Sequence, residues 1–316
     1  MLLGKVFKNI DKKYKNIHFK DIRFNSKECK PNDIFFAIRG NNYNGNKYIY
    51  DAINNGAKII VSNLRIRSTK TKKVLFIHSK DTRKMLSEVS SQLYNLKPNN
   101  IIAVTGTNGK TSIANFYQQI LSLNNKKVAS IGTLGILSKQ LNLKTNNTTI
   151  DSVSIHKILQ KLKKLRVNNV IIEASSHGLK QQRLNNIKFK TVLFTNLSRD
   201  HLDYHKTIKD YLNSKLILFD KLVKTKGNII FDEKTNETKQ LKIISKKRKL
   251  REYTFGSTKS FVRIIDIKKI NDHNKINCII KGKKYSFKTT LIGKIQIKNL
   301  MFAIMAAYLS KLKINE

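Results

Sequence analysis

The chain has 316 residues, 40% of them hydrophobic, which is enough to build the cores of two domains and excludes a disordered polypeptide. No run of about 18 apolar residues occurs and the N-terminus lacks the apolar segment of a signal peptide, so we expect no membrane insertion and predict a cytoplasmic protein. The two cysteines, Cys29 and Cys278, lie far apart in the sequence, which argues against a disulfide framework and a zinc-binding pattern.

The net charge is unusually positive. Lys and Arg number 63 against 20 Asp and Glu, a formal +43 at pH 7, which would normally suggest a nucleic acid or another polyanion as partner. The lysines are, however, spread over the whole chain, and Lys, Asn and Ile, which AT-rich codons encode, are all abundant. We therefore attribute the charge to compositional drift and expect no specific nucleic-acid partner, although such a surface would attract a nucleotide-linked substrate.

The N-terminal part of the chain is predicted to form a small α/β domain. Short apolar runs predict strands at residues 33–39, 58–61 and 74–77. Helices are expected at residues 48–55 and 82–96. The polar segment 97–100 contains one of only two prolines, so we place a domain boundary there and expect domains at residues 1–97 and 98–316.

After this boundary, strands alternate with helices, which predicts a mostly parallel sheet wrapped by helices. Asp151 is expected to cap one of these helices at its N-terminus. Residues 228–290 are predicted to be a β-rich, lysine-rich extension. Functional groups in such a fold collect at the carboxyl ends of the strands. The predicted strands are 101–104, 170–174 and 192–195, and the predicted helices are 112–123 and 151–166.

A phosphate-binding loop is predicted at residues 104–111, VTGTNGKT, which follow a strand and precede a helix. Small residues allow backbone N–H groups to surround a phosphate, and the helix N-terminus adds positive potential. Lys110 would bridge the β- and γ-phosphates, and the Thr111 hydroxyl would bind Mg²⁺. The generic pattern has Gly where Val104 stands, so the match to that pattern is imperfect.

Four segments of the chain resemble the Mur ligase family and follow one another in that family's order. The segment TGTNGKTS at residues 105–112 is similar to the family's ATP loop. Three more, NNTT at 146–149, EASSHGLKQQR at 173–183 and FTNLSRDHLDYH at 194–205, resemble its E-type branch, the UDP-MurNAc-tripeptide synthetases. The resemblance extends from about residue 20 to the end of the chain.

This resemblance implies a fold and a reaction. The fold is α/β, with a small uridine-binding domain followed by a P-loop ATPase domain whose sheet is mostly parallel. In the reaction, ATP phosphorylates the terminal carboxylate of UDP-MurNAc-L-Ala-D-Glu, and the amine of diaminopimelate or lysine then attacks the acyl phosphate. Phosphoryl transfer needs charge neutralisation and alignment more than covalent help, which is consistent with a lysine, bound Mg²⁺ and few bases.

The resemblance also implies catalytic roles. Glu173 and His201 help to bind a second Mg²⁺, while Thr111 binds the first. Lys215, in a predicted helix at residues 210–218, matches a lysine that the family carbamylates with CO₂, and a carbamate can bind Mg²⁺ as an ammonium group cannot. The expected catalytic set is Lys110, Glu173, His201 and Lys215. The expected nucleotide-binding set is Thr107, Asn108, Gly109, Lys110, Thr111, Ser112 and Asn299.

Substrate contacts are implied in the same way. In the N-terminal domain the chain departs from the family's pattern, because Asn25 and Lys27 stand where Asp and Arg are usual and the segment 40–45 lacks the usual His and Asp. Lysine cannot make the bidentate contacts of arginine, so weakened UDP-MurNAc binding is expected. The residues expected to hold the substrate are Ser26, Asn147, Thr148, Thr149, Ser175 and Arg183.

Several alternatives remain open at this level. From the residues alone, Lys215 could be one more ordinary lysine, and Asn299 a polar residue on an amphipathic helix. Family members carry a C-terminal domain that closes over ATP, and we expect it to be missing here or supplied by a separate chain. The alternative hypotheses for the function are a non-catalytic remnant that binds nucleotide only, a folylpolyglutamate-type ligase, and a basic nucleic-acid-binding protein.

Overall fold

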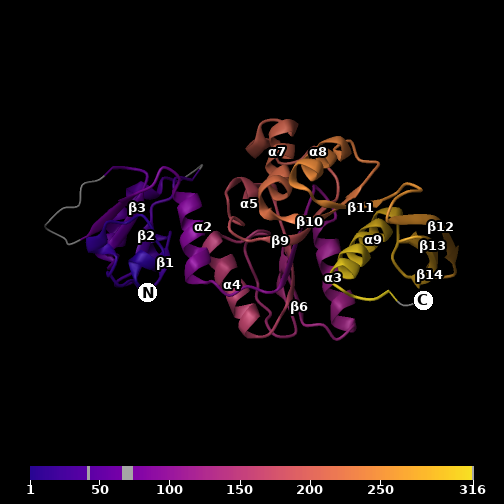
Figure 1. The fold of residues 1–316 in the computed structure, drawn as a ribbon, viewed down its shortest axis with the longest axis horizontal. Helices are drawn as coiled ribbons and strands as arrows, with labels where there is room; N and C mark the ends of the chain where they lie inside the picture. The colour runs from indigo at the N-terminus through magenta and orange to yellow at the C-terminus, as the bar shows by residue number, and fades with distance from the viewer. Residues whose placement is uncertain (41–42, 66–73, 315–316) are drawn as a thin grey trace. The chain divides into compact units, whose positions relative to one another are not determined.

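The computed structural model describes residues 1–40, 43–65 and 74–314, which form two compact units (Figure 1). The first unit contains residues 1–96 together with 151–160 and 181–186. The second contains the rest of the described chain. The chain therefore returns to the first unit twice after leaving it. Within the described ranges, no helix is both long and apolar enough to cross a membrane.

The first unit is built on a four-stranded sheet in the order β1-β2-β3-β4, and every neighbouring pair in it is parallel. The three residues of β2 are all buried, as expected for a strand of a parallel sheet that is covered on both faces. The elements are β1 Ile22–Arg23, β2 Ile34–Phe36, β3 Ile59–Ser62, β4 Leu75–His78, α1 Ile49–Asn54 and α2 Thr82–Leu93.

The elements predicted for this unit are confirmed, but several ends were wrong. The helix expected at residues 48–55 starts at Ile49, because a 3₁₀ turn at Gly45–Tyr48 comes first and the Asn44 side chain caps that turn. The helix expected to reach residue 96 ends at Leu93. There the next residue, Tyr94, leaves the helical backbone and donates its hydroxyl to Asp21 Oδ1 at 2.6 Å.

The second unit contains a ten-stranded sheet in the order β14-β13-β12-β11-β10-β9-β5-β8-β6-β7. The strands from β12 to β6 pair in parallel, which confirms the predicted mostly parallel sheet, and the hairpins at both edges are antiparallel. The strands are β5 Asn100–Thr105, β6 Val128–Gly132, β7 Gly135–Leu137, β8 Asn169–Glu173, β9 Phe189–Phe194, β10 Val223–Asp232, β11 Arg251–Phe255, β12 Val262–Ile270, β13 His273–Ile280 and β14 Lys283–Thr289.

Helices of the second unit pack on this sheet through apolar faces. In Figure 1, α3 lies beside α9, and buried residues of both helices, such as Tyr117 and Phe302, belong to one core cluster with the sheet. Asp151 caps α4 as predicted, because its Oδ1 accepts from Ser154 N at 2.9 Å. The helices after β5 are α3 Lys110–Leu123, α4 Ser152–Lys164, α5 Ser176–Lys180, α6 Leu202–His205, α7 Ile208–Ile217, α8 Thr238–Arg248 and α9 Lys294–Leu309, and residues 152–160 of α4 belong to the first unit.

The extension predicted at residues 228–290 is only partly β-rich. Helix α8 interrupts it, and its buried residues Leu241 and Ser245 lie one turn apart. The prediction failed there because lysines separate the few apolar residues of this segment, so their helical spacing is difficult to recognise in the sequence. The hairpin strands β12, β13 and β14 agree with it.

The arrangement of the central strands brings three of the four family-like segments, those at residues 105–112, 173–183 and 194–205, to one edge of the sheet. Val104 of β5 pairs with Glu173 of β8, and Thr105 of β5 pairs with Phe194 of β9. Because neighbouring parallel strands end at the same edge of a sheet, the segments that follow β5, β8 and β9 meet there.

Candidate functional site

The loop between β5 and α3 has two glycines that no other residue can replace without displacement. Gly106 has φ of 149°, and a Cβ there would lie 1.8 Å from Thr195 Oγ1. Gly109 has φ of 87° and caps α3, and a Cβ there would lie 2.6 Å from Asn299 Oδ1. These contacts place Asn299, a buried residue of α9, directly against the loop. The first turn of α3, which begins at Lys110, presents N–H groups that have no partner within the helix.

The end of β9 supports this loop. The Thr195 hydroxyl donates to Asn108 O at 2.6 Å, and Asn108 N donates to Asn196 Oδ1 at 3.0 Å. Thr107 N donates to Asn196 O at 2.9 Å. Sequence reasoning missed this supporting role of Thr195 and Asn196, although both lie in the motif at residues 194–205. Their position directly after a strand was the available signal.

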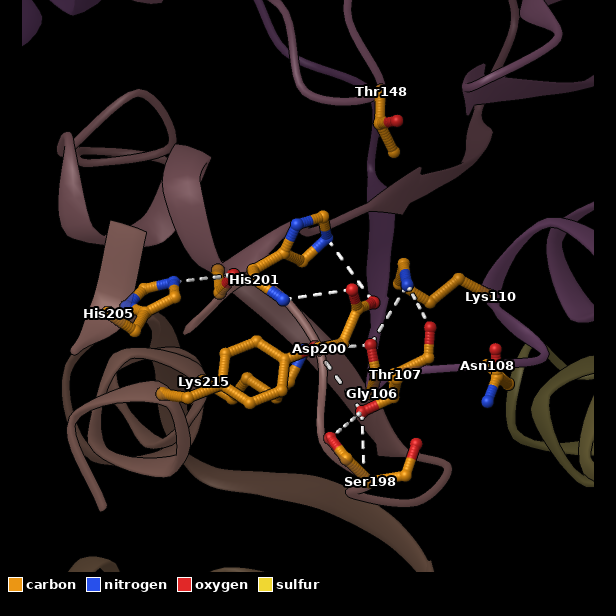
Figure 2. A network of polar contacts seen from close by, with 12 residues as sticks. Gly106, Thr107, Asn108, Lys110, Thr148, Ser198, Asp200, His201, His205 and Lys215 are labelled. Atoms are coloured by element: carbon orange, nitrogen blue, oxygen red, sulfur yellow. Dashed lines mark hydrogen bonds and ion pairs between the residues drawn. The ribbon is translucent and has the colours of Figure 1, made fainter. Parts of the chain in front are cut away.

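Two lysines converge on the loop from different helices (Figure 2). Lys110 Nζ donates to Gly106 O at 2.9 Å and to Thr107 O at 2.7 Å. Lys215 Nζ, from α7, donates to the same Gly106 O at 2.7 Å. Lys215 is 1% exposed, so the structure excludes a surface lysine at this position.

Burial shifts the pKa of both lysines in the same direction. Burial lowers the pKa of Lys110, against the opposing effect of the Glu173 and Asp200 carboxylates. Burial, together with the neighbouring charge of Lys110, lowers the pKa of Lys215 to about 6. This shift favours the uncharged, nucleophilic form of the Lys215 amine. Asp200, to which sequence reasoning assigned no separate role, is the nearby carboxylate that opposes both shifts.

The Glu173 carboxylate at the end of β8 is held by threonines. Thr111 Oγ1 donates to Oε2 at 2.8 Å, and Thr133 donates its backbone N–H to Oε1 at 3.0 Å and its hydroxyl to Oε2 at 3.2 Å. A Cβ on Gly132 would lie 1.9 Å from Oε1, so only glycine leaves room for this carboxylate. A carboxylate beside two hydroxyls is an all-oxygen donor set, which suits Mg²⁺. Thr133 is a further residue that the sequence analysis did not select.

The expected substrate residues of the second unit have different environments. The Thr148 hydroxyl lies 3.0 Å from Thr133 Oγ1, which joins it to the Glu173 cluster, and Asn147 is exposed. Thr149 is 2% exposed. Its hydroxyl donates to Glu173 O and accepts from Ser175 N, so it is hydrogen-bonded within the protein. Ser175 Oγ accepts from Gly178 N at 3.1 Å and so caps the N-terminus of α5.

Two expected substrate residues belong to the first unit. Ser26 is buried, and its carbonyl accepts from Asn55 Nδ2 at 3.0 Å. Arg183 donates to Gln181 Oε1 through Nε at 3.1 Å and through Nη2 at 2.8 Å. Asn41 and Asn42, which form part of the altered segment at residues 40–45, lie outside the described residues.

The structure does not join the three expected ligands of the second Mg²⁺. Among the described residues, no hydrogen bond or ion pair connects Glu173, His201 and Lys215. The His201 ring faces Asp200, with Nε2 3.4 Å from Oδ2, and its side chain is 48% exposed (Figure 2). The described part of the chain also contains no group of three or more His, Cys, Asp or Glu side chains placed to hold a metal ion.

Comparison with known protein families gives two matches. Residues 104–307 match the Mur ligase middle domain, and residues 16–94 match the Mur ligase family, catalytic domain. The UDP-N-acetylmuramoyl-L-alanyl-D-glutamate--2,6-diaminopimelate ligase of Rickettsia prowazekii is 35% identical over 316 residues, which cover 98% of this chain and 64% of that protein. This chain thus spans less than two thirds of the length of that relative.

Solved structures show the same fold. A UDP-N-acetylmuramoyl-L-alanyl-D-glutamate--2,6-diaminopimelate ligase superposes with a TM-score of 0.87 at 24% identity, covering 99% of this chain and 64% of the other. An FPGS–AMPPCP complex superposes with a TM-score of 0.59 at 13% identity, covering 74% of this chain and 65% of the other. At such identities the likeness concerns the fold alone.

Proposed function

Since the chain belongs to the Mur ligase family, we propose that it serves an ATP-dependent ligase reaction that adds diaminopimelate to UDP-MurNAc-L-Ala-D-Glu, with ADP and phosphate as the other products. The observation that carries this proposal is the hydrogen bond between Thr111 of the phosphate loop and the Glu173 carboxylate. It places a nucleotide-binding element and a cation-binding group side by side, as ligation through an acyl phosphate requires. Because ATP is the energy source, the proposal keeps the expected cytoplasmic location.

The nucleotide would lie along the loop and the first turn of α3. The expected residues Thr107, Asn108, Gly109, Lys110, Thr111 and Ser112 form one continuous segment there. The Lys110 ammonium, now shared between two loop carbonyls, is close enough to the loop to neutralise phosphate charge. Asn299 contacts Gly109 from α9, which supports its proposed place beside the nucleotide.

The oxygen cluster around Glu173 supports a Mg²⁺ site with Thr111 and Thr133. When bound there, Mg²⁺ would neutralise charge on the transferred phosphoryl group. Glu173 is already oriented for this purpose by three hydrogen bonds. Proximity of Thr148 to this cluster supports its role near the carboxylate that is phosphorylated.

Lys215 supports the proposed carbamate. A neutral amine adds CO₂ through its lone pair and then loses one proton, which yields a carbamate anion, and the lowered pKa of Lys215 makes that neutral form available. We propose that carbamylated Lys215, together with His201, completes a second Mg²⁺ site. Mass spectrometry of the Lys215 peptide after chemical trapping of carbamates tests this step directly, and an absence of trapped carbamate under saturating bicarbonate rejects it.

Phosphate release by the purified chain tests the ligase itself. Mg-ATP and UDP-MurNAc-L-Ala-D-Glu are supplied with diaminopimelate or with lysine, and the product is identified by mass. Release that depends on the UDP-peptide and on diaminopimelate is the expected result. Nucleotide binding without release leaves only a nucleotide-binding role, and release that depends on folate instead identifies a folylpolyglutamate-type ligase.

A further inference from the structure

His205 is a buried histidine that the proposed reaction does not use. It is the last residue of α6 and is 0% exposed. Its Nε2 lies 2.9 Å from Ser176 Oγ of α5. Its Nδ1 lies 3.4 Å from Ser214 Oγ and 3.5 Å from Asp210 Oδ2, both on α7. A single imidazole ring therefore joins two helices through its two nitrogens.

The surrounding hydrogen bonds select one tautomer of this ring. The Ser214 hydroxyl donates to Asp210 O at 2.8 Å, so toward His205 its oxygen acts as an acceptor. The Asp210 carboxylate also accepts only. Both contacts therefore require a proton on Nδ1, which leaves the Nε2 lone pair to accept the Ser176 hydroxyl. Burial lowers the pKa of His205, which favours this neutral ring.

The order Ser176, His205, Asp210 resembles the arrangement that activates a nucleophilic serine. Accessibility excludes that use here, because Ser176 is 2% exposed and His205 is 0% exposed, so no substrate reaches the hydroxyl. A buried and satisfied polar network holds its elements in one arrangement instead. The role of this network is therefore structural, and it acts on the residues that α5 and α7 carry.

Helix α7 carries Lys215 directly after Ser214. Lys215 Nζ reaches Gly106 O at 2.7 Å and lies 4.1 Å from the centre of the Tyr211 ring. The Tyr211 hydroxyl lies 3.2 Å from Thr107 Oγ1, so α7 contacts the phosphate loop at two points. On the other side, Ser176 opens α5, three residues after Glu173.

We propose that His205 is a positioning residue whose Nδ1–H tautomer fastens α5 to α7 and thereby holds Lys215 against the phosphate loop. The importance of Lys215 for ligation rests on the proposed function, but its placement by His205 does not. Amine labelling of the chain needs no substrate, so its outcome is independent of whether the chain is a ligase.

Amine labelling measures the placement of Lys215. The full chain is treated briefly with acetic anhydride, and peptide mass spectrometry gives the labelling rates of Lys215 and, as an internal reference, Lys110. Ser176→Ala and His205→Phe remove the two ends of the Ser176–His205 hydrogen bond. His205→Gln keeps a hydrogen-bonding group in the ring's place. Ser245→Ala is the matched control, because Ser245 is a buried helical serine of α8 whose hydroxyl bonds Leu250 O.

Lys215 labelling is expected to rise at least about fivefold in Ser176→Ala and His205→Phe, since one buried hydrogen bond is lost. Lys110 labelling should stay unchanged, His205→Gln should label more slowly than His205→Phe, and Ser245→Ala should behave as wild type. Unchanged Lys215 labelling in Ser176→Ala overturns the proposal. A parallel rise at Lys110 also overturns it, because it would show general loosening of the fold. If His205→Phe does not fold, Ser176→Ala decides alone.

Discussion

Two sides of the proposed site differ in the charge that each of them stabilises. The carboxylate side consists of Glu173, Thr111 and Thr133, and three hydrogen bonds stabilise the Glu173 anion. The lysine side consists of Lys215, His205 and Ser176, none more than 2% exposed, and burial there disfavours cations. The carboxylate side thus favours a bound cation, whereas the lysine side favours the uncharged form of its amine. Lys110 bonds two loop carbonyls, shares Gly106 O with Lys215, and interacts electrostatically with the Glu173 carboxylate.

The largest expected loss of activity follows substitution of Lys110, because this side chain interacts with Glu173 on the carboxylate side and with Lys215 on the lysine side. Lys110→Met should reduce phosphate release by about 10²- to 10³-fold, the usual cost of removing one charge-stabilising donor. Steady-state phosphate release measures the loss. The control is Lys242→Met, whose side chain is 49% exposed on α8. If Lys110→Met released phosphate as fast as Lys242→Met, the phosphate-loop assignment would be wrong.

The lysine side can be tested through pH. The folded pKa of Lys215, about 6, lies below its unfolded value of 10.5, so between these values the unfolded chain binds the extra proton. Burying Lys215 therefore destabilises the fold most below pH 6, and this penalty shrinks as pH rises toward 10.5. The stability of Lys215→Met relative to wild type should therefore be greater at pH 6 than at pH 9, by on the order of 4 kcal/mol.

Urea unfolding of both proteins at the two pH values provides that measurement. The difference between the pH values isolates titration, because the lost Gly106 hydrogen bond and the added methionine contribute at both. A pH-independent difference between Lys215→Met and wild type would show that Lys215 stays charged, and the contrast between the two sides would disappear.

The carboxylate side can be tested through Thr133. Thr133→Val keeps the backbone N–H bond to Glu173 but removes the hydroxyl bond, which is worth about 1.5 kcal/mol for a charged partner. The Mg²⁺ concentration for half-maximal activity should rise about tenfold. Thr133→Ser retains the hydroxyl and should restore wild-type Mg²⁺ dependence. Equal Mg²⁺ dependence in both variants would remove Thr133 from the site.

The smallest effect is expected at the exposed ion pair between α5 and α7. Lys180 Nζ lies 2.6 Å from Asp210 Oδ2, with side chains 40% and 38% exposed. Lys180→Met should change the free energy of unfolding by only about 0.5 kcal/mol, as for other exposed pairs. Urea unfolding in low and high salt measures it. A loss of several kcal/mol would mean that this pair, rather than His205, fastens the two helices.

The local elements of this protein could be predicted from its sequence to a large extent. The strand before the phosphate loop, the helix after it and the Asp151 cap follow from short-range patterns, and all are present. The predictions failed where contacts with residues that are distant in the sequence determine the local structure. Tyr94 ends α2 because its hydroxyl bonds distant Asp21, and α8 lies where lysines mask a sparse apolar period.

The sequence by itself determined the mostly parallel sheet and the phosphate loop, because hydrophobic period and glycine placement are local properties. It also indicated Glu173 and Lys215, through motifs. Only the tertiary structure decided that Thr133 holds Glu173, that His205 joins two helices and that Lys215 is buried, which lowers its pKa. Those properties depend on burial and on partners 9 to 109 residues away, and no local pattern encodes desolvation.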